Sequence, residues 1–413
     1  MPYKFPKDFL WGASTSSHQV EGNTYNQWTI WEKENADKLA KQGGIKLPSM
    51  LSASPVENPY TKDPNNYISG RAVDHYRLYE QDFDIIKKLN LNAYRFSIEW
   101  SRIEPEPGKW DQKEIVHYQQ YISGLKERNI EPVLTIWHWT LPVWFTAMGG
   151  FEKKENIKYF ERYASKIVEE FNVKYIIILN EPNSYTFFSY QFGIWPPEVK
   201  SSLMTIKVYY HFALAHKAVY KIIKQNKSDA LVGIAANIFD AKPTSPHNPI
   251  NAIEISLGNY INNWWFLNRV KNQLDFIGLN YYFTNYNDWK LQSKNPESPV
   301  NDMGWYMDPG NIYTVLKDLD SRYRKPIIIT ENGLADTNDK YRKWWIKETI
   351  DSMNQAIKEG VDLRGYLHWS LLDNFEWDHG WWPKFGLVAV DLKTMKRSIR
   401  PSAEWFARQI NKL

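Results

Sequence analysis

The stretch IIILNEP, at residues 176–182, decides how the rest of the sequence is interpreted. Its four apolar residues are typical of a strand that is buried on both faces, as in a parallel sheet. They lead directly into a polar pair, Asn180 and Glu181, at a point where the chain must turn. A nearly identical stretch, IIITENG at residues 327–333, carries Glu331 at the corresponding place. Two buried strands that both end in a glutamate call for a common explanation.

Apolar runs of strand length recur along the chain and alternate with amphipathic stretches of helical period. The runs occupy residues 9–15, 93–100, 132–139, 175–182, 231–238, 275–282, 326–333 and 363–373. The predicted helices occupy residues 74–89, 114–129, 155–171, 204–223, 311–323 and 343–360. Strands that alternate with helices, with no linker-like stretch, predict a single (β/α)8 TIM barrel that forms one domain over residues 1–413. Residues 40–70 are rich in Pro, Gly, Ser and Asn and are expected to form a long loop after the first strand.

The composition argues against several classes of function. The 51 basic and 47 acidic residues give a net charge of only +4, without the basic stripe that nucleic acid requires. The absence of cysteine excludes disulfides and thiolate chemistry. No window approaches the roughly 18 apolar residues of a membrane span, and the N-terminal sequence MPYKFPKDFLWG lacks a signal-type apolar segment. We therefore expect no nucleic-acid partner, no membrane span and a cytoplasmic location.

Aromatic residues are unusually frequent, with 20 Trp, 26 Tyr and 19 Phe. Composition alone favours a core role for most of them, although Trp also suits a site that stacks the flat faces of sugars. The glycine-rich loops that bind nucleotides do not follow any of the predicted strands, and no Gly-x-Ser-x-Gly turn is present. We expect no cofactor.

The two glutamates suggest a specific chemistry. In a TIM barrel the carboxyl ends of the strands carry the catalytic groups, so Glu181 and Glu331 would face each other across the barrel mouth. Two carboxyl groups that flank one bond are the machinery of glycoside hydrolysis, where one must be protonated and the other ionised. Arg95 could hold one of them ionised, and that negative charge would raise the pKa of the other.

Other uses of these residues remain open at this point. A single glutamate at a strand end is more often a helix-cap partner or half of an ion pair, but the repeated phrase favours a functional pair. His138, Glu181 and Glu331 could also supply metal ligands. No His-Glu-x-x-His or His-x-His spacing supports such a site, so we predict no metal.

Six ordered motifs resemble those of the family 1 glycoside hydrolases, the β-glucosidase and β-glycosidase family. They are FLWGASTSSHQVEG (9–22), YRFSIEWSRIEP (94–105), LNEP (179–182), IGLNYY (277–282), ITENG (329–333) and WSLLDNFEW (369–377). The resemblance covers almost the whole chain and is greatest to the compact archaeal and bacterial members. It implies the barrel fold and activity on β-glycosides.

The resemblance also implies roles for individual residues. Glu331 would be the nucleophile and Glu181 the general acid/base, while Asn180 would hold the sugar 2-hydroxyl. The residues expected to support the nucleophile are Arg95, Tyr282 and Asn280, of which Asn280 could instead be a direct ligand. The residues expected to bind the sugar ring are Gln19, His138, Trp139, Glu376 and Trp377, with Trp369 beneath the ring and Trp305 on the aglycone side.

The resulting hypothesis is a retaining β-glycosidase that releases terminal β-glucosyl and β-galactosyl residues through a covalent glycosyl-enzyme. Retention predicts that the two carboxyl groups lie about 5–5.5 Å apart. Glu376 would repel a phosphate, so unphosphorylated sugars are expected. The alternatives are a transglycosylase on the same carboxylates or a non-catalytic sugar-binding protein. The expected partner is a small-molecule β-glycoside, and a homo-oligomer is possible.

Overall fold

A computed structural model describes residues 3–44, 58–290, 292–296 and 298–412. In this part of the chain eight parallel strands close into a barrel in the order β1-β10-β9-β7-β5-β4-β3-β2. The strands are β1 (Leu10–Ser14), β2 (Ala93–Ser97), β3 (Glu131–Trp137), β4 (Tyr175–Asn180), β5 (Leu231–Asn237), β7 (Phe276–Asn280), β9 (Ile327–Asn332) and β10 (Leu363–Trp369). They coincide with the predicted apolar runs, so the predicted (β/α)8 barrel is confirmed.

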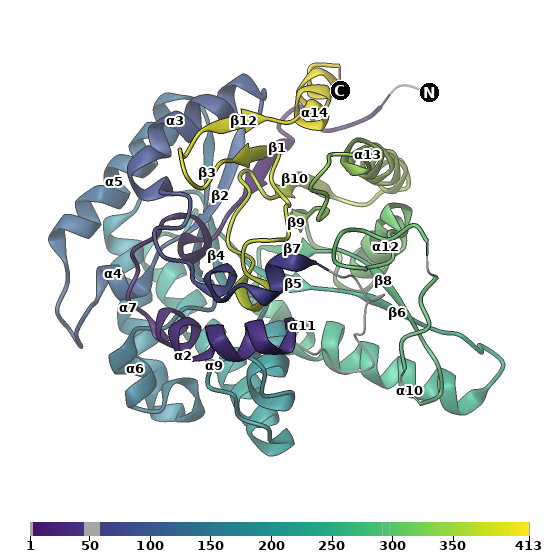
Figure 1. Cartoon of the computed structure of the whole chain (residues 1–413), viewed down its shortest axis with the longest axis horizontal. Coiled ribbons are helices and arrows are strands. Elements are labelled where there is room, and N and C mark those ends of the chain that lie inside the picture. The colour runs from purple at the N-terminus through teal and green to yellow at the C-terminus, as the bar shows by residue number, and fades with distance from the viewer. Residues whose placement is uncertain (1–2, 45–57, 291, 297, 413) are drawn as a thin grey trace.

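Helices surround the barrel, as Figure 1 shows. The outer helices are α3 (His75–Lys88), α5 (Gln112–Glu127), α7 (Ile157–Glu170), α9 (Ser202–Asn226), α11 (Trp265–Val270), α12 (Ile312–Tyr323), α13 (Arg342–Lys358) and α14 (Pro401–Ile410). The six predicted helices are confirmed, each within three residues of its predicted bounds. In α3, for example, Phe83 and Ile86 are buried and Arg77 and Lys87 are exposed, as the helical period requires.

The segment after β1 differs from the prediction. The helix α2 (Gln27–Gln42) begins at Asn26, whose side chain accepts a hydrogen bond from the Thr29 backbone, and ends at Gly43 in the left-handed conformation. Its buried face includes the polar Glu32, which interrupts the apolar period, so the sequence did not reveal it. Of the predicted loop 40–70, residues 45–57 lie outside the described residues. The rest holds the end of α2 and the single turns η2 (Pro59–Lys62) and η3 (Pro64–Tyr67).

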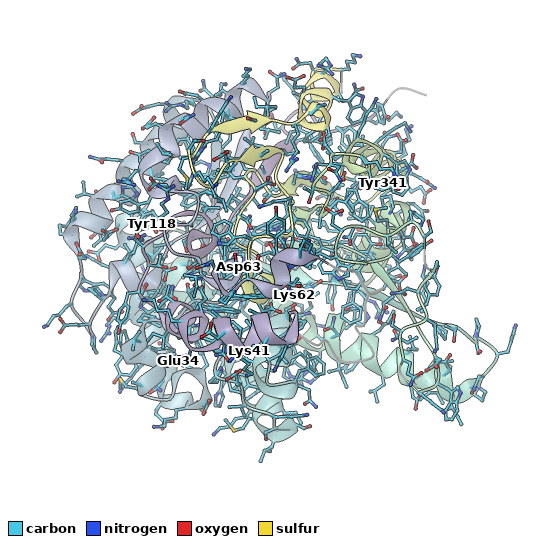
Figure 2. The ribbon with its side chains drawn as sticks, in the orientation of Figure 1. Glu34, Lys41, Lys62, Asp63, Tyr118 and Tyr341 are labelled. Atoms are coloured by element: carbon cyan, nitrogen blue, oxygen red, sulfur yellow. The ribbon has the colours of Figure 1, made fainter. Side chains whose placement is uncertain are left out.

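Each strand contributes one buried side chain to a cluster that fills the barrel interior. Its members are Leu10, Ala93, Val133, Ile177, Ala235, Phe276, Ile328 and Leu367. A second, larger apolar cluster lies between the strands and the helices. Tyr118 of α5 belongs to this second cluster, whereas Glu34 and Lys41 of α2 are exposed; the three side chains are labelled in Figure 2. The filled interior confines any ligand site to an end of the barrel.

Short elements follow the carboxyl ends of the strands. They are α1 (Ser17–Val20), α4 (Trp100–Ile103), α6 (Val143–Ala147), α8 (Pro182–Thr186), the π-helix η6 (Phe187–Gln191), α10 (Pro249–Asn259) with the π-helix η7 (Tyr260–Trp264), and the 3-10 turn η10 (Trp377–His379). Two small sheets accompany them, a parallel pair β6 (Asp240–Pro243) and β8 (Thr284–Asn287) and an antiparallel pair β11 (Val388–Val390) and β12 (Arg397–Ile399). No helix among the described residues is long and apolar enough to cross a membrane.

Candidate active site

A cavity of about 430 Å³ opens at the carboxyl ends of the strands and holds both glutamates. Nine of the predicted site residues line it: His138, Trp139, Glu181, Tyr282, Trp305, Glu331, Trp369, Glu376 and Trp377. The other four, Gln19, Arg95, Asn180 and Asn280, each form a hydrogen bond with one of these lining residues. The structure therefore brings all the predicted site residues together around one cavity.

Glu331 ends its strand between two hydrogen-bond donors. The guanidinium of Arg95, which is completely buried, donates to its Oε1, and the Tyr282 hydroxyl donates to its Oε2 at 2.7 Å. Thr135 accepts from Nε of Arg95 at 3.0 Å and so fixes the guanidinium in place. The burial of Tyr282, and after it the negative charge of Glu331, raise the pKa of Tyr282 well above the ordinary value, so this hydroxyl stays a donor. The carboxylate is thus oriented on both oxygens.

Glu181 lies in a different environment. Burial raises its pKa to about 7, and the negative charge of Glu331 adds to this effect. Hydrogen bonds from Asn280 and Ser184 and the charge of Arg95 act in the opposite direction but do not cancel it. The two carboxyl groups therefore differ in their surroundings as a proton donor and an oriented carboxylate must.

Asn280 has a different partner from the predicted one. Its amide nitrogen donates to Oε1 of Glu181 at 2.6 Å and not to Glu331, the residue it was expected to support. The hydroxyl of Thr330 donates to the Asn280 amide oxygen at 2.7 Å, and this turns the amide nitrogen toward Glu181. Only the packing of β9 against β7 reveals this orientation.

The backbone is strained at three of the lining residues. Trp139, Glu181 and Trp377 have φ angles of 74°, 41° and 49°, in the left-handed region that side chains with a Cβ rarely adopt. Such strain persists only where the surrounding structure enforces it, and it is common at functional sites. Position 333, two residues after Glu331, requires glycine for a steric reason, because a Cβ there would lie 1.7 Å from the carbonyl oxygen of Trp369.

His138 offers an unused hydrogen-bond donor to the cavity. The amide nitrogen of Asn180 lies 3.0 Å from its Nε2. An amide nitrogen can only donate, so Nε2 accepts and the neutral ring carries its proton on Nδ1. Burial and the charge of Arg95 keep the pKa of His138 well below its usual range. Nδ1 is buried with no hydrogen-bond partner among the described residues, so a bound hydroxyl group would satisfy it.

Glu376 is another polar residue that lines the cavity. The amide nitrogen of Gln19 contacts its Oε2 at 3.3 Å. Burial raises the pKa of Glu376 to about 8, so at neutral pH this side chain can donate as well as accept a hydrogen bond. The predicted repulsion of a phosphate therefore weakens as Glu376 becomes protonated below about pH 8. Trp369 and Trp377 flank His138, each with its ring centroid 6.0 Å from the imidazole.

Several lining residues were not predicted from the sequence. Asn237 ends β5, and the rule that polar strand ends face the mouth could have identified it. Ser184 lies one turn after Glu181 and had no distinguishing signal. The other apolar residues that line the cavity come from the segments after β4, β5 and β7, and Phe385 comes from the segment after β10; their positions depend on the folded structure. In the described part of the chain, no group of three or more His, Asp or Glu residues is arranged to hold a metal ion.

Comparison with known proteins supports the resemblance seen in the sequence. The family model described as glycosyl hydrolase family 1 matches residues 1–272 and 266–412. The 1,4-β-D-glucan glucohydrolase of Thermotoga neapolitana and the β-glucosidase A of Thermotoga maritima are each 32% identical, over 98% of this chain and 98% of their own.

Solved structures agree. A β-glycosidase from Pyrococcus horikoshii superposes with a TM-score of 0.87 and 33% identity, over 99% of this chain and 95% of its own. The β-glucosidase from Thermotoga maritima in complex with deoxynojirimycin gives a TM-score of 0.85 and 30% identity, over 99% of both chains. The predicted family and enzyme class are thereby confirmed: the chain belongs to glycosyl hydrolase family 1 and is a glycoside hydrolase.

Proposed function

We propose that the protein is a retaining β-glycosidase that removes terminal β-D-glucosyl residues, and also β-D-galactosyl residues, from small O-glycosides. The observation that carries the proposal is the difference between two carboxyl groups in one cavity. Arg95 and Tyr282 orient Glu331, whereas burial raises the pKa of Glu181 to about 7. The relatives named above as β-glucosidases support the choice of glucose.

In the first step Glu331 acts as the nucleophile. Its carboxylate oxygen forms a bond to the anomeric carbon while the bond to the leaving oxygen breaks. Glu181 gives its proton to that oxygen, so the aglycone leaves as a neutral alcohol. The products of this step are a glycosyl ester of Glu331 and an ionised Glu181.

In the second step water replaces the aglycone. Formation of the ester removes the negative charge of Glu331, which is the second cause of the raised pKa of Glu181. The carboxylate of Glu181 takes a proton from water as the water oxygen attacks the anomeric carbon. The ester bond breaks, Glu331 regains its charge, and the sugar leaves with its original configuration.

The remaining residues would bind the sugar ring. The Nδ1–H group of His138, which has no partner among the described residues, would donate a hydrogen bond to one hydroxyl group of the sugar ring. Glu376 and Gln19 would form hydrogen bonds with two other hydroxyl groups. Asn180, whose amide oxygen accepts from Arg95 at 2.6 Å, would present its amide nitrogen to the 2-hydroxyl. Trp369 would lie against the apolar face of the ring.

The decisive experiment measures hydrolysis of aryl β-glycosides by the wild type, Glu181→Gln and Glu331→Gly. The wild type should give a product of retained configuration by NMR, and Glu331→Gly should lose several orders of magnitude in activity. Added azide should convert the activated substrate to an α-glycosyl azide with Glu331→Gly and to a β-glycosyl azide with the acid/base variant.

Four outcomes would reject parts of the proposal. Undiminished activity of Glu331→Gly excludes it as the nucleophile. An inverted product excludes the two-step mechanism. Complete inactivity of the wild type on every β-glucoside and β-galactoside would favour a sugar-binding protein, and transfer to added alcohol that outpaces hydrolysis would favour a transglycosylase.

A further inference from the structure

A second cavity of about 280 Å³ lies between α12, the α10–η7 segment and the residues that follow β5. We call it the outer pocket, and its polar side chains include Asp240, Ser256, Asn259, Tyr260, Asp318 and Arg322. It shares no lining residue with the cavity that holds the two glutamates. In Figure 1 α10 and α12 lie on the same side of the barrel.

The two cavities lie on opposite faces of the α10–η7 segment. Ile255, Gly258 and Asn262 line the cavity with the glutamates, whereas Ser256 and Asn259 line the outer pocket. With about 3.6 residues per turn, these two sets of side chains point away from each other. A ligand in the outer pocket would therefore not contact either glutamate.

The charges of the outer pocket balance each other. Beside the pocket, Nζ of Lys242 lies 3.3 Å from the carboxylate of Asp240. Burial raises the pKa of Asp318, and the charge of Arg322, one turn later on α12, opposes this rise. Two carboxylates thus face two cations, so neither an anion nor a cation gains a net attraction here. This balance favours a ligand that is polar but neutral.

Several polar groups of the outer pocket are available to a ligand. Among the described residues, the hydroxyl groups of Ser256 and Tyr260 and the carboxylate of Asp318 have no hydrogen-bond partner. Arg322 forms no ion pair with Asp318, and its guanidinium carbon lies 4.4 Å from the centre of the Trp264 ring. All four polar side chains are exposed, so a ligand only has to replace water at them.

The size and the chemistry of the outer pocket suit a single sugar ring. Its volume is just below the range of about 300–1,000 Å³ that is typical of small-molecule sites, so one ring would fill it. Each sugar hydroxyl group both donates and accepts, which matches a carboxylate next to a guanidinium. The ring of Tyr260 is 44% exposed, and an aromatic face packs well against the apolar face of a sugar.

We propose that the outer pocket is a second, non-catalytic binding site for a neutral monosaccharide unit. The sugar donates a hydrogen bond to the carboxylate of Asp318 and accepts one from the guanidinium of Arg322, with its apolar face against Tyr260. The proposal goes beyond the proposed function, because it concerns a separate pocket and involves neither glutamate.

The test uses methyl α-D-glucopyranoside, because a β-glycosidase leaves this sugar intact. The protein is labelled with 3-fluorotyrosine, and the fluorine signal that is absent from Tyr260→Phe is assigned to Tyr260. Added sugar should shift this signal until it saturates, which gives a dissociation constant for the outer pocket. A signal that does not move at any concentration of the sugar would overturn the proposal.

Variants on α12 show whether the shift arises in the outer pocket, since α12 contributes no residue to the cavity with the glutamates. Asp318→Ala and Arg322→Gln should each raise the dissociation constant at least tenfold, as expected for the loss of a hydrogen bond to a charged group. The matched control is Asp229→Ala, which removes an exposed aspartate that lines neither cavity and should leave the constant unaltered. An equal rise in the control, or no rise in either α12 variant with a native melting temperature, would contradict the assignment.

Charged analogues test the argument from charge balance. Glucose 6-phosphate, and D-glucosamine at a mildly acidic pH, should bind no more tightly than the neutral sugar. Tighter binding of either analogue would show that the pocket selects an anion or a cation and would overturn the proposal. These measurements need no catalysis, so they decide the proposal whether or not the protein hydrolyses β-glycosides.

Discussion

The substitution Glu181→Gln should change how the stability of the protein depends on pH. Burial, followed by the charge of Glu331, raises the pKa of Glu181 from its ordinary 4.5 to about 7 in the folded protein. This difference corresponds to about 3 kcal/mol by which the folded structure favours the protonated over the ionised carboxyl group. Glutamine has nearly the same shape but does not ionise.

The sign of the effect follows from the direction of that shift. Because the pKa of Glu181 is raised on folding, the stabilising contribution of its protonated form is fully present below pH 4.5. It is lost as the pH rises through about 7. Over this window the wild type should therefore lose up to about 3 kcal/mol of unfolding free energy relative to Glu181→Gln, and no more above about pH 8.

The assay is denaturant unfolding of both proteins between pH 4 and 9, with the difference in unfolding free energy plotted against pH. Glu376→Gln serves as a comparison, since the pKa of Glu376 is about 8 and its transition should extend about one pH unit higher. A difference between wild type and Glu181→Gln that stays constant from pH 4 to 8, or that changes in the opposite direction, would refute the reasoning.

Three further predictions concern activity and packing. Tyr282→Phe removes the 2.7 Å bond to Glu331 and should lower kcat/KM about 10- to 150-fold, as expected for a hydrogen bond to a charged group, measured on an aryl β-glucoside. The wild-type kcat/KM should fall above about pH 7 as Glu181 ionises, and Glu181→Gln should lack this fall on a substrate whose leaving group needs no proton. Gly333→Ala would place a Cβ 1.7 Å from a backbone oxygen and should lower the melting temperature, whereas Gly258→Ala, with nothing within 4 Å, should leave it unchanged or raise it.

The sequence predicted which residues gather around the site, but it did not predict every contact between them. Arg95 and Tyr282 were expected beside Glu331 and do contact it. Asn280 was expected there too, but it contacts Glu181, because a hydrogen bond from Thr330 turns its amide. Such an orientation depends on a neighbouring strand that is 50 residues away in the chain.

The sequence predicted almost none of the apolar residues that line the cavity. Trp305 was expected on the aglycone side, but Phe239, Phe283 and Ile261 carried no signal as ligand-contacting residues. Each lies in or beside an irregular segment after a strand, and apolar residues in such segments are ordinarily part of the core. Their gathering around one opening is a consequence of the way the loops pack.

The sequence by itself determined the eight strands, their polar ends and the family, because apolar period and strand-end motifs are local properties of the chain. The family motifs predicted the roles of the two glutamates, but only the tertiary structure shows that burial raises the pKa of Glu181 and that Arg95 and Tyr282 donate hydrogen bonds to Glu331. It also decided which apolar residues line the cavity. The physical reason is that burial and charge interactions depend on distances between residues far apart in the chain, and spacing along the sequence does not contain those distances.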